Sequence, residues 1–184
     1  MTLSVTTLVL SIAAVSFEPT GMCSVRELRN SAGYRWTVER IGEFVDRAAV
    51  IVRAKAIAPD SLPLARQDSV RWLSAVRFEV LQSIRDSVPR GQLVLWGRLV
   101  EADDFNRMAV PYQMVRPGGQ GGDCYASEYK LGAEYLLLLS LDARGLNVRW
   151  MPLAPLNEQV RGADDPWVQW VRGRASHRPA SPGA

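Results

Sequence analysis

Apolar and polar residues along this chain follow two different periods. In residues 37–47 the apolar side chains recur three and four positions apart, which predicts an amphipathic helix with Thr37 as its N-cap. The same spacing returns after Asp165 and Pro166, where a capping aspartate and a first-turn proline predict the start of a second helix. One aromatic face of this second helix is expected to pack on a sheet through Trp167, Trp170 and Val171.

Between these helices, several segments are typical of β-strands. In one of them Val76, Phe78 and Val80 alternate with charged residues, as in a strand with one buried face. Other predicted strands are almost continuously apolar. The last two, residues 134–140 and 146–151, flank a turn and are expected to pair as a hairpin. Five short antiparallel strands close most simply into a small barrel, because closure removes the exposed sheet edges. The predicted strands cover residues 48–58, 74–84, 92–96, 134–140 and 146–151.

Two irregular stretches interrupt this pattern. Residues 59–70 contain two prolines and are expected to form a loop. Residues 97–123 are expected to form a much longer loop, with one short strand at residues 108–115. A loop of this length inside a compact domain is usually functional or mobile, so residues 97–123 are a candidate binding region.

The long loop and the segment before the second helix contain candidate sites. The string Glu101-Ala-Asp-Asp104 has carboxylates for a cation such as calcium but lacks calcium-loop spacing, so a solvated acidic loop is the alternative. The glycine-rich residues 118–122 offer backbone N–H groups to an anion, or simply form a surface loop. Three charged residues near the second helix either contact a partner or help to cap and dock that helix: Glu158, Arg161 and Asp164.

The composition limits the classes of function. The chain has 184 residues and is 47% hydrophobic, which suits one domain with a sizeable core and excludes general disorder. The net charge is only +3 and no long run of like charges occurs, so an electrostatic nucleic-acid binder is not expected. Six tryptophans offer rings for stacking on bases or sugars, but core packing is the simpler explanation.

The single histidine excludes several kinds of catalysis. His177 lies in the polar residues 174–184, which are expected to be a disordered tail. Without a core histidine, Ser-His-Asp and Cys-His catalysis and histidine zinc sites are not expected, and no glycine-rich nucleotide motif occurs. We therefore expect no enzymatic activity, no cofactor and no metal. An enzyme that uses carboxylates alone, such as Asp103 and Asp104, is an alternative that no motif supports.

The N-terminal residues are typical of an export signal. Residues 3–15 form an apolar run that is too short to span a membrane and has the length of a secretory signal core. Small residues at 14 and 16 predict cleavage after Ser16, although no Lys or Arg precedes the run. The alternative is a buried N-terminal strand of a cytosolic protein. We expect a signal at residues 1–16 and a folded domain at residues 17–173.

The chain has two cysteines, Cys23 and Cys124. A bond between them would close a loop of about 100 residues, worth about 4.7 kcal/mol in the chain-entropy treatment. An oxidising compartment would favour this disulfide. The alternative is two separate buried thiols.

Four strings of residues occur in a fixed order around the two cysteines. They are residues 47–56 (Arg-Ala-Ala-Val-Ile-Val-Arg-Ala-Lys-Ala), residues 76–84, the pair Asp123-Cys124, and residues 129–139 with a glycine before a Tyr-Leu run. In this order they resemble the netrin-like domain, whose best-known members are the tissue inhibitors of metalloproteinases. The likeness covers roughly residues 23–152.

The resemblance implies an exported, disulfide-bonded, OB-like five-stranded antiparallel β-barrel with two packed helices. In the inhibitors, the amine and carbonyl of an N-terminal Cys chelate the protease zinc, and a segment beside its disulfide partner completes the contact ridge. Two differences separate this chain from them: residues 17–22 precede Cys23 after the expected cut, and Val25 stands where the family has a second Cys. The corresponding candidate partner-binding ridge is Cys23, Ser24, Val25, Gly122, Asp123 and Cys124.

The functional expectation is an exported protein-binding module. Its partner is expected at the barrel end where Cys23, Cys124 and residues 97–123 gather. One alternative is a metalloprotease inhibitor of the tissue-inhibitor type, and another is a cytosolic OB-fold protein that binds single-stranded nucleic acid. We expect a secreted or periplasmic monomer without a transmembrane span.

Overall fold

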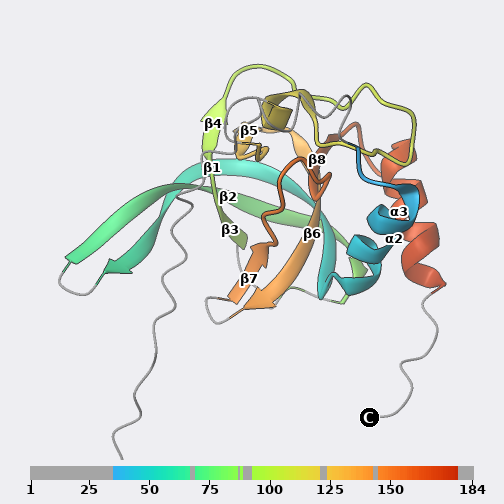
Figure 1. Cartoon of the computed structure of the whole chain (residues 1–184). Helices are drawn as coiled ribbons and strands as arrows, with labels where there is room; N and C mark the ends of the chain where they lie inside the picture. Colours follow the sequence, from blue (N-terminus) through green and yellow to red (C-terminus); the bar gives the residue numbers. More distant parts are fainter. Residues whose placement is uncertain are drawn as a thin grey trace, which may run out of the picture.

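The computed structural model describes residues 35–66, 69–86, 88, 93–120, 124–142 and 145–177. Figure 1 shows a curled antiparallel sheet with two helices beside it. The expected signal at residues 1–16 lies outside the described residues. So do Cys23, Ser24, Val25, Gly122 and Asp123, together with residues 178–184.

Six strands form the main sheet, and its path runs β3-β2-β1-β6-β7 with β8 also paired to β6. β7 and β8 lie end to end along one side of β6, because residues 139–142 of β6 pair with β7 and residues 134–137 pair with β8. β1 pairs with the other side of β6. The strands are β1 (Val50–Arg66), β2 (Ser69–Arg85), β3 (Leu93–Trp96), β6 (Glu134–Asp142), β7 (Gly145–Val148) and β8 (Asn157–Val160).

The two ends of the sheet path approach each other but do not pair within the described residues. β3 and β7 lie close together, and the ring of Trp96 at the end of β3 meets the ring of Trp150 edge-on at 5.1 Å. Register shifts between β1 and β2 help the sheet to curl in this way. The structure is therefore mainly β, with an antiparallel sheet of six strands where we expected five.

Both predicted helices are confirmed. α2 (Val38–Arg47) begins after Thr37, whose hydroxyl oxygen accepts a hydrogen bond from the backbone N–H of Arg40 at 3.3 Å. α3 (Pro166–Ser176) begins after Asp165, which accepts from the Trp167 N–H at 2.9 Å. The expected boundary between domain and tail at residue 173 was wrong, because α3 continues through Ser176 and His177 forms its C-cap.

The expected loop at residues 59–70 was also wrong, because the chain there continues β1 and turns back as β2. β1 pairs with β6 only through Lys55, so its later part is an edge of the sheet. Prolines are tolerated in edge strands, which explains Pro59 and Pro63. Figure 1 shows this end of the β1–β2 hairpin extending away from the rest of the sheet.

The region between β3 and β6 contains little regular structure. A small parallel pair joins β4 (Arg98–Val100) to β5 (Glu128–Lys130), and a 3-10 turn, η1 (Pro117–Gln120), lies between them. The short strand expected at residues 108–115 is absent, since those residues form bends and extended segments without strand pairing. Residues 101–127 are called the β4–β5 loop below.

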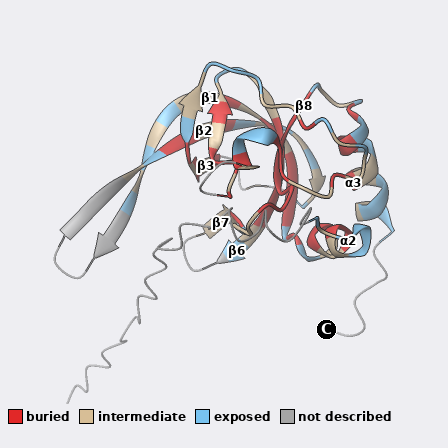
Figure 2. Ribbon diagram, turned by 45° about the horizontal axis from the view of Figure 1, so that its top comes forward, coloured by how far each residue is buried: buried red, intermediate tan, exposed pale blue. Residues whose placement is uncertain are grey.

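The hydrophobic core is built from the strands of the main sheet and from both helices, and Figure 2 shows buried residues along the central strands and in the helices. Five consecutive residues of β6, from Tyr135 to Leu139, are buried. In contrast, none of residues 57–63 on the projecting hairpin is buried. The core includes Val45, Ile51, Val52, Phe78, Leu137, Leu139, Trp167 and Val171.

Candidate functional site

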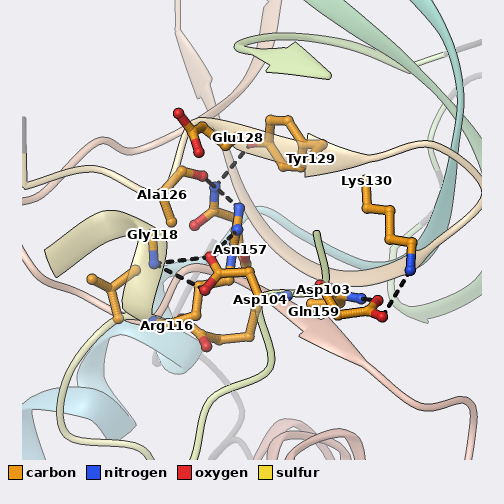
Figure 3. A network of polar contacts seen from close by, with 12 residues as sticks. Asp103, Asp104, Arg116, Gly118, Ala126, Glu128, Tyr129, Lys130, Asn157 and Gln159 are labelled. Carbon is orange, nitrogen blue, oxygen red and sulfur yellow. Dashed lines mark hydrogen bonds and ion pairs between the residues drawn. The ribbon is translucent and has the colours of Figure 1, made fainter. Parts of the chain in front are cut away.

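A fully buried arginine organises the β4–β5 loop. The Arg116 guanidinium donates to Asp104 Oδ2 at 2.6 Å, to the Ala126 carbonyl at 2.7 Å and to the Asn157 carbonyl at 2.9 Å. Asp104 lies early in the loop, Ala126 lies at its end, and Asn157 begins β8. One side chain therefore connects three separate parts of the chain (Figure 3).

Two tyrosine rings surround the same guanidinium. The Arg116 Cζ lies 5.3 Å from the ring centroids of both Tyr129 and Tyr135, within the range of a cation–π contact. Burial raises the pKa of Tyr129 to about 12 and also raises the pKa of Tyr135, so both phenols stay protonated. The Tyr129 hydroxyl oxygen accepts from Asn157 Nδ2 at 2.9 Å. The cation thus has aromatic faces and hydrogen-bond acceptors in place of water.

The loop is also attached to β8 through Glu158, which is fully buried. One carboxylate oxygen accepts from the Arg116 backbone N–H and the other from Asn106 Nδ2, each at 3.0 Å. Burial raises the pKa of Glu158 to about 7, although Arg116 and the hydrogen bond from Asn106 oppose this shift. Asn106 also donates to the Met114 carbonyl at 2.8 Å, which ties the two arms of the loop together.

Both aspartates of the acidic string bind groups of the chain itself. Asp104 accepts from the Gly118 N–H at 2.9 and 3.0 Å in addition to its bond with Arg116. Asp103 accepts from Gln159 Nε2 and from Lys130 Nζ, each at 2.7 Å. The hydrogen bond from Lys130, followed by that from Gln159, lowers the pKa of Asp103. The glycine-rich segment therefore does hold an anion through Gly118, and that anion is the Asp104 carboxylate.

The hydrogen bonds and ion pairs of Asp103 and Asp104 account for the two aspartates of the acidic string without a calcium ion. Among the described residues, no group of three His, Cys, Asp or Glu side chains is placed to hold a metal ion. The string is best described as a set of loop anchors, because each aspartate already has a cationic partner, Arg116 or Lys130.

A surface pocket of about 270 Å³ lies against this network. On one wall, the Arg161 Cζ lies 4.1 Å from the centroid of the Phe105 ring. Phe105 also forms a parallel bridge with Gln159 of β8, which holds this part of the loop on the sheet. The pocket is lined by Asp103, Asp104, Phe105, Arg107, Pro117 and Arg161.

Of the candidate partner-binding ridge, only Cys124 lies within the described residues. Cys124 is fully buried in a left-handed backbone conformation with φ 57°, and its carbonyl accepts from the Leu153 N–H at 2.9 Å. It stands two residues before Ala126, whose carbonyl accepts from Arg116 and from Asn157. The Cys124 segment is thus attached to the polar network, and the pairing with Cys23 remains a prediction.

The remaining residues that the sequence suggested as contacts differ in how far they are buried. Glu158 was a candidate partner contact and is instead fully buried, whereas Asp164 is exposed and Arg161 is exposed at the pocket. Trp167 is fully buried, and three further tryptophans are partly buried against the core, which confirms core packing for these four: Trp36, Trp150, Trp167 and Trp170. Trp96 is half-buried and its ring meets that of Trp150.

Sequence reasoning missed Arg116, Asn106 and Asn157. None of them belongs to a motif, and their partners are far away along the chain. The one available signal was the run of polar residues 157–159 close to an apolar hairpin, because polar residues in a strand-forming context often mark a buried network.

Comparison with models of protein families finds no match to the chain, and comparison with curated proteins finds none either. The function proposed below is therefore inferred from the geometry of the β4–β5 loop. In the part of the chain that the structure describes, no helix is both long enough and apolar enough to cross a membrane.

Proposed function

We propose that this chain is an exported, disulfide-tied domain of the OB-like, netrin-like kind that binds another protein through its β4–β5 loop. The observation that carries the proposal is the Arg116 network, which holds a long loop in one conformation and supports a pocket on its outer side. Long loops inside compact domains are usually functional when they lack secondary structure of their own.

The energetics of the network support a role beyond stability. Burying an arginine and a glutamate costs desolvation energy, and apolar side chains of similar volume often stabilise a core equally well. Buried ionic groups can instead select one conformation of a segment, as polar core residues do in some coiled coils. We infer that the Arg116 network serves this purpose for the loop.

The curled sheet and the cysteines support the remaining parts of the proposal. The contact between the rings of Trp96, at the end of β3, and Trp150, just after β7, supports the OB-like part of the proposal, because the two ends of the sheet path lie close together there. Cys124 lies within the β4–β5 loop, two residues before Ala126, whose carbonyl accepts from Arg116, so a disulfide at Cys124 would tie the same loop. Export and the partner itself rest on the sequence pattern.

The test is site-specific photo-crosslinking in the extracellular or periplasmic fraction of the native host. A photoreactive residue replaces Ala109, which is exposed on the loop. Deletion of the loop is unsuitable, because Tyr112, Val115 and Arg116 are buried. The matched control position is Leu141, which is 71% exposed near the opposite end of β6.

A discrete partner crosslinked at position 109 and absent at position 141 is the expected result. The loop that carries position 109 meets β8 at Gln159, which pairs with Tyr135 of β6. Tyr135 lies six residues before Leu141, so a strand rise of about 3.3 Å per residue places Leu141 about 20 Å from that meeting point. Absence of a crosslink at position 109, or equal crosslinking at both positions, would contradict the proposal.

A further inference from the structure

We propose that the pocket between Arg107 and Arg161 binds the carboxylate of an Asp or Glu side chain on the protein partner. This inference rests on the proposed function, since it names the chemistry that the β4–β5 loop recognises. It concerns the pocket formed by the loop and the segment after β8, a site distinct from the candidate ridge around Cys124.

The charged side chains that line the pocket differ in whether they already have an ion-pair partner within the described residues. Both carboxylates in its wall are already bound, Asp103 by Lys130 and Asp104 by Arg116. Neither Arg107 nor Arg161 forms an ion pair with any residue that the structure describes. The Arg161 backbone N–H donates to Asp165 Oδ2 at 3.0 Å, but its guanidinium has no carboxylate partner there. The pocket therefore offers two guanidinium groups to an incoming anion.

The two arginines lie on separate, anchored segments of the chain, and the Arg161 guanidinium is itself in contact with a ring. Arg107 follows Asn106, whose amide is fixed between Glu158 and the Met114 carbonyl. The Arg161 side chain rests on the Phe105 ring, a contact that restrains a guanidinium while leaving its N–H donors unused. Restraint before binding lowers the entropy cost of association, so the pocket is suited to bidentate recognition of a carboxylate.

The lining of the pocket favours a carboxylate side chain as the ligand. Its volume of about 270 Å³ is large enough for an Asp or Glu side chain and lies near the lower limit of roughly 300–1,000 Å³ for small-molecule sites. The Phe105 ring supplies an apolar surface for the methylene groups of Asp or Glu. Asp103 and Asp104 remain in the wall and repel a dianion more than a single carboxylate. This arrangement favours a carboxylate over a phosphate group.

The first experiment uses a defined probe and no partner. N-acetyl-glutamate N-methylamide is titrated into the protein while NMR follows the Nε–H signals of the arginines. We expect Arg107 and Arg161 to shift together, and the neutral N-acetyl-glutamine N-methylamide to leave them unchanged. Equal shifts with the neutral probe, absence of any shift, or tighter binding of inorganic phosphate would overturn the inference.

Variants provide the second measurement. Arg107, Arg161 and the control Arg149 are all exposed, so glutamine at each position is expected to leave the fold intact. Arg107→Gln and Arg161→Gln should each weaken probe binding about tenfold, the equivalent of about 1.4 kcal/mol. Arg149→Gln is the matched control, since Arg149 is also exposed and has no ion pair with a described residue. Loss of binding in the Arg149 variant as well would point to general charge attraction and contradict a specific pocket.

The same variants separate this inference from the proposed function. If crosslinking at position 109 persists unchanged in Arg107→Gln and Arg161→Gln, the loop binds a protein but the pocket does not hold its carboxylate. If the probe binds at the pocket but position 109 never crosslinks, the pocket is real and the protein-binding function fails.

Discussion

Arg116 and Asp104 form an ion pair at 2.6 Å in which the arginine is fully buried and the aspartate side chain keeps 16% of its surface exposed. The pair links the core to the wall of the surface pocket. Twelve residues separate the two in sequence, so this bond closes the first part of the β4–β5 loop on itself. A change in the buried network should therefore alter the outer surface of the loop.

Replacing Arg116 by methionine should destabilise the fold strongly. The substitution keeps an apolar stem between the tyrosine rings but removes one donor from Asp104 and one from each of two carbonyl oxygens, and it leaves the Asp104 carboxylate without its cationic partner. Breaking a buried pair on one side costs about 3–5 kcal/mol, which urea unfolding will measure. The control is Arg98→Met, because Arg98 pairs with Glu128 while 71% exposed and should cost less than about 1 kcal/mol. Similar losses in both variants would show that the buried network stabilises the fold no more than an exposed ion pair does.

Glu158 should make stability fall as pH rises through mildly acidic values. Its pKa is about 7 in the folded chain and 4.5 in the reference state, so between these values the folded chain holds a proton that the unfolded chain releases. Proton linkage then lowers the free energy of unfolding from pH 4.5 to pH 7, by on the order of 3 kcal/mol. Urea unfolding between pH 4.5 and pH 8 will measure this slope.

The variant Glu158→Gln should remove this contribution while keeping an oxygen that accepts from the Arg116 N–H. The difference in stability between wild type and variant should therefore shift in favour of the variant as pH rises. Glu79→Gln on the exposed face of β2 is the control and should leave the slope unchanged. A pH-independent difference between wild type and Glu158→Gln would refute the raised pKa.

Gly97 is required where the chain passes from β3 to β4. Its φ is 146°, and a Cβ at this position would lie 2.2 Å from the Ser127 carbonyl oxygen. That oxygen accepts from the Arg98 N–H at 2.9 Å, so Gly97→Ala should separate β4 from β5. We expect a loss of more than about 3 kcal/mol, because steric overlap with backbone adds to strain of about 1–2 kcal/mol.

Gly162→Ala separates the two effects, since Gly162 has a similar φ of 135° and open space around it. This variant should lose only the strain of about 1–2 kcal/mol in thermal or urea unfolding. Equal losses at Gly97 and Gly162 would mean that the approach of Ser127 is unimportant.

The parts of the fold that local patterns determine were predictable. The helical spacing and the caps Thr37 and Asp165 located α2 and α3, and apolar runs located the cores of β1, β2, β3, β6 and β7. Local patterns gave wrong predictions where the secondary structure depends on pairing with a distant strand. The prolines of residues 59–70 argued against a strand, yet pairing with β2 carries β1 through both of them.

The candidate site was the least predictable part for the same reason. β8 has the sequence Asn-Glu-Gln-Val, which shows no apolar alternation although all four residues are buried. Its burial depends on Arg116, which lies 42 residues from Glu158 in sequence and resembles any other arginine of the chain. A buried polar network is a property of long-range contacts, and no spacing within the sequence reveals it.

The state of the mature chain is the last prediction, and intact mass of protein from the native host will measure it. The expected species begins near Phe17 and takes up a thiol label only after reduction, because Cys23 and Cys124 are expected to be bonded. Closing a loop of about 100 residues stabilises the fold by about 4.7 kcal/mol, so the reduced protein should also unfold at lower urea concentration. A chain that begins at Cys23 would free its amine and favour the metalloprotease inhibitor. A full-length chain with two labelled thiols would contradict both export and the disulfide, and single-stranded nucleic acid would then be the ligand to test first.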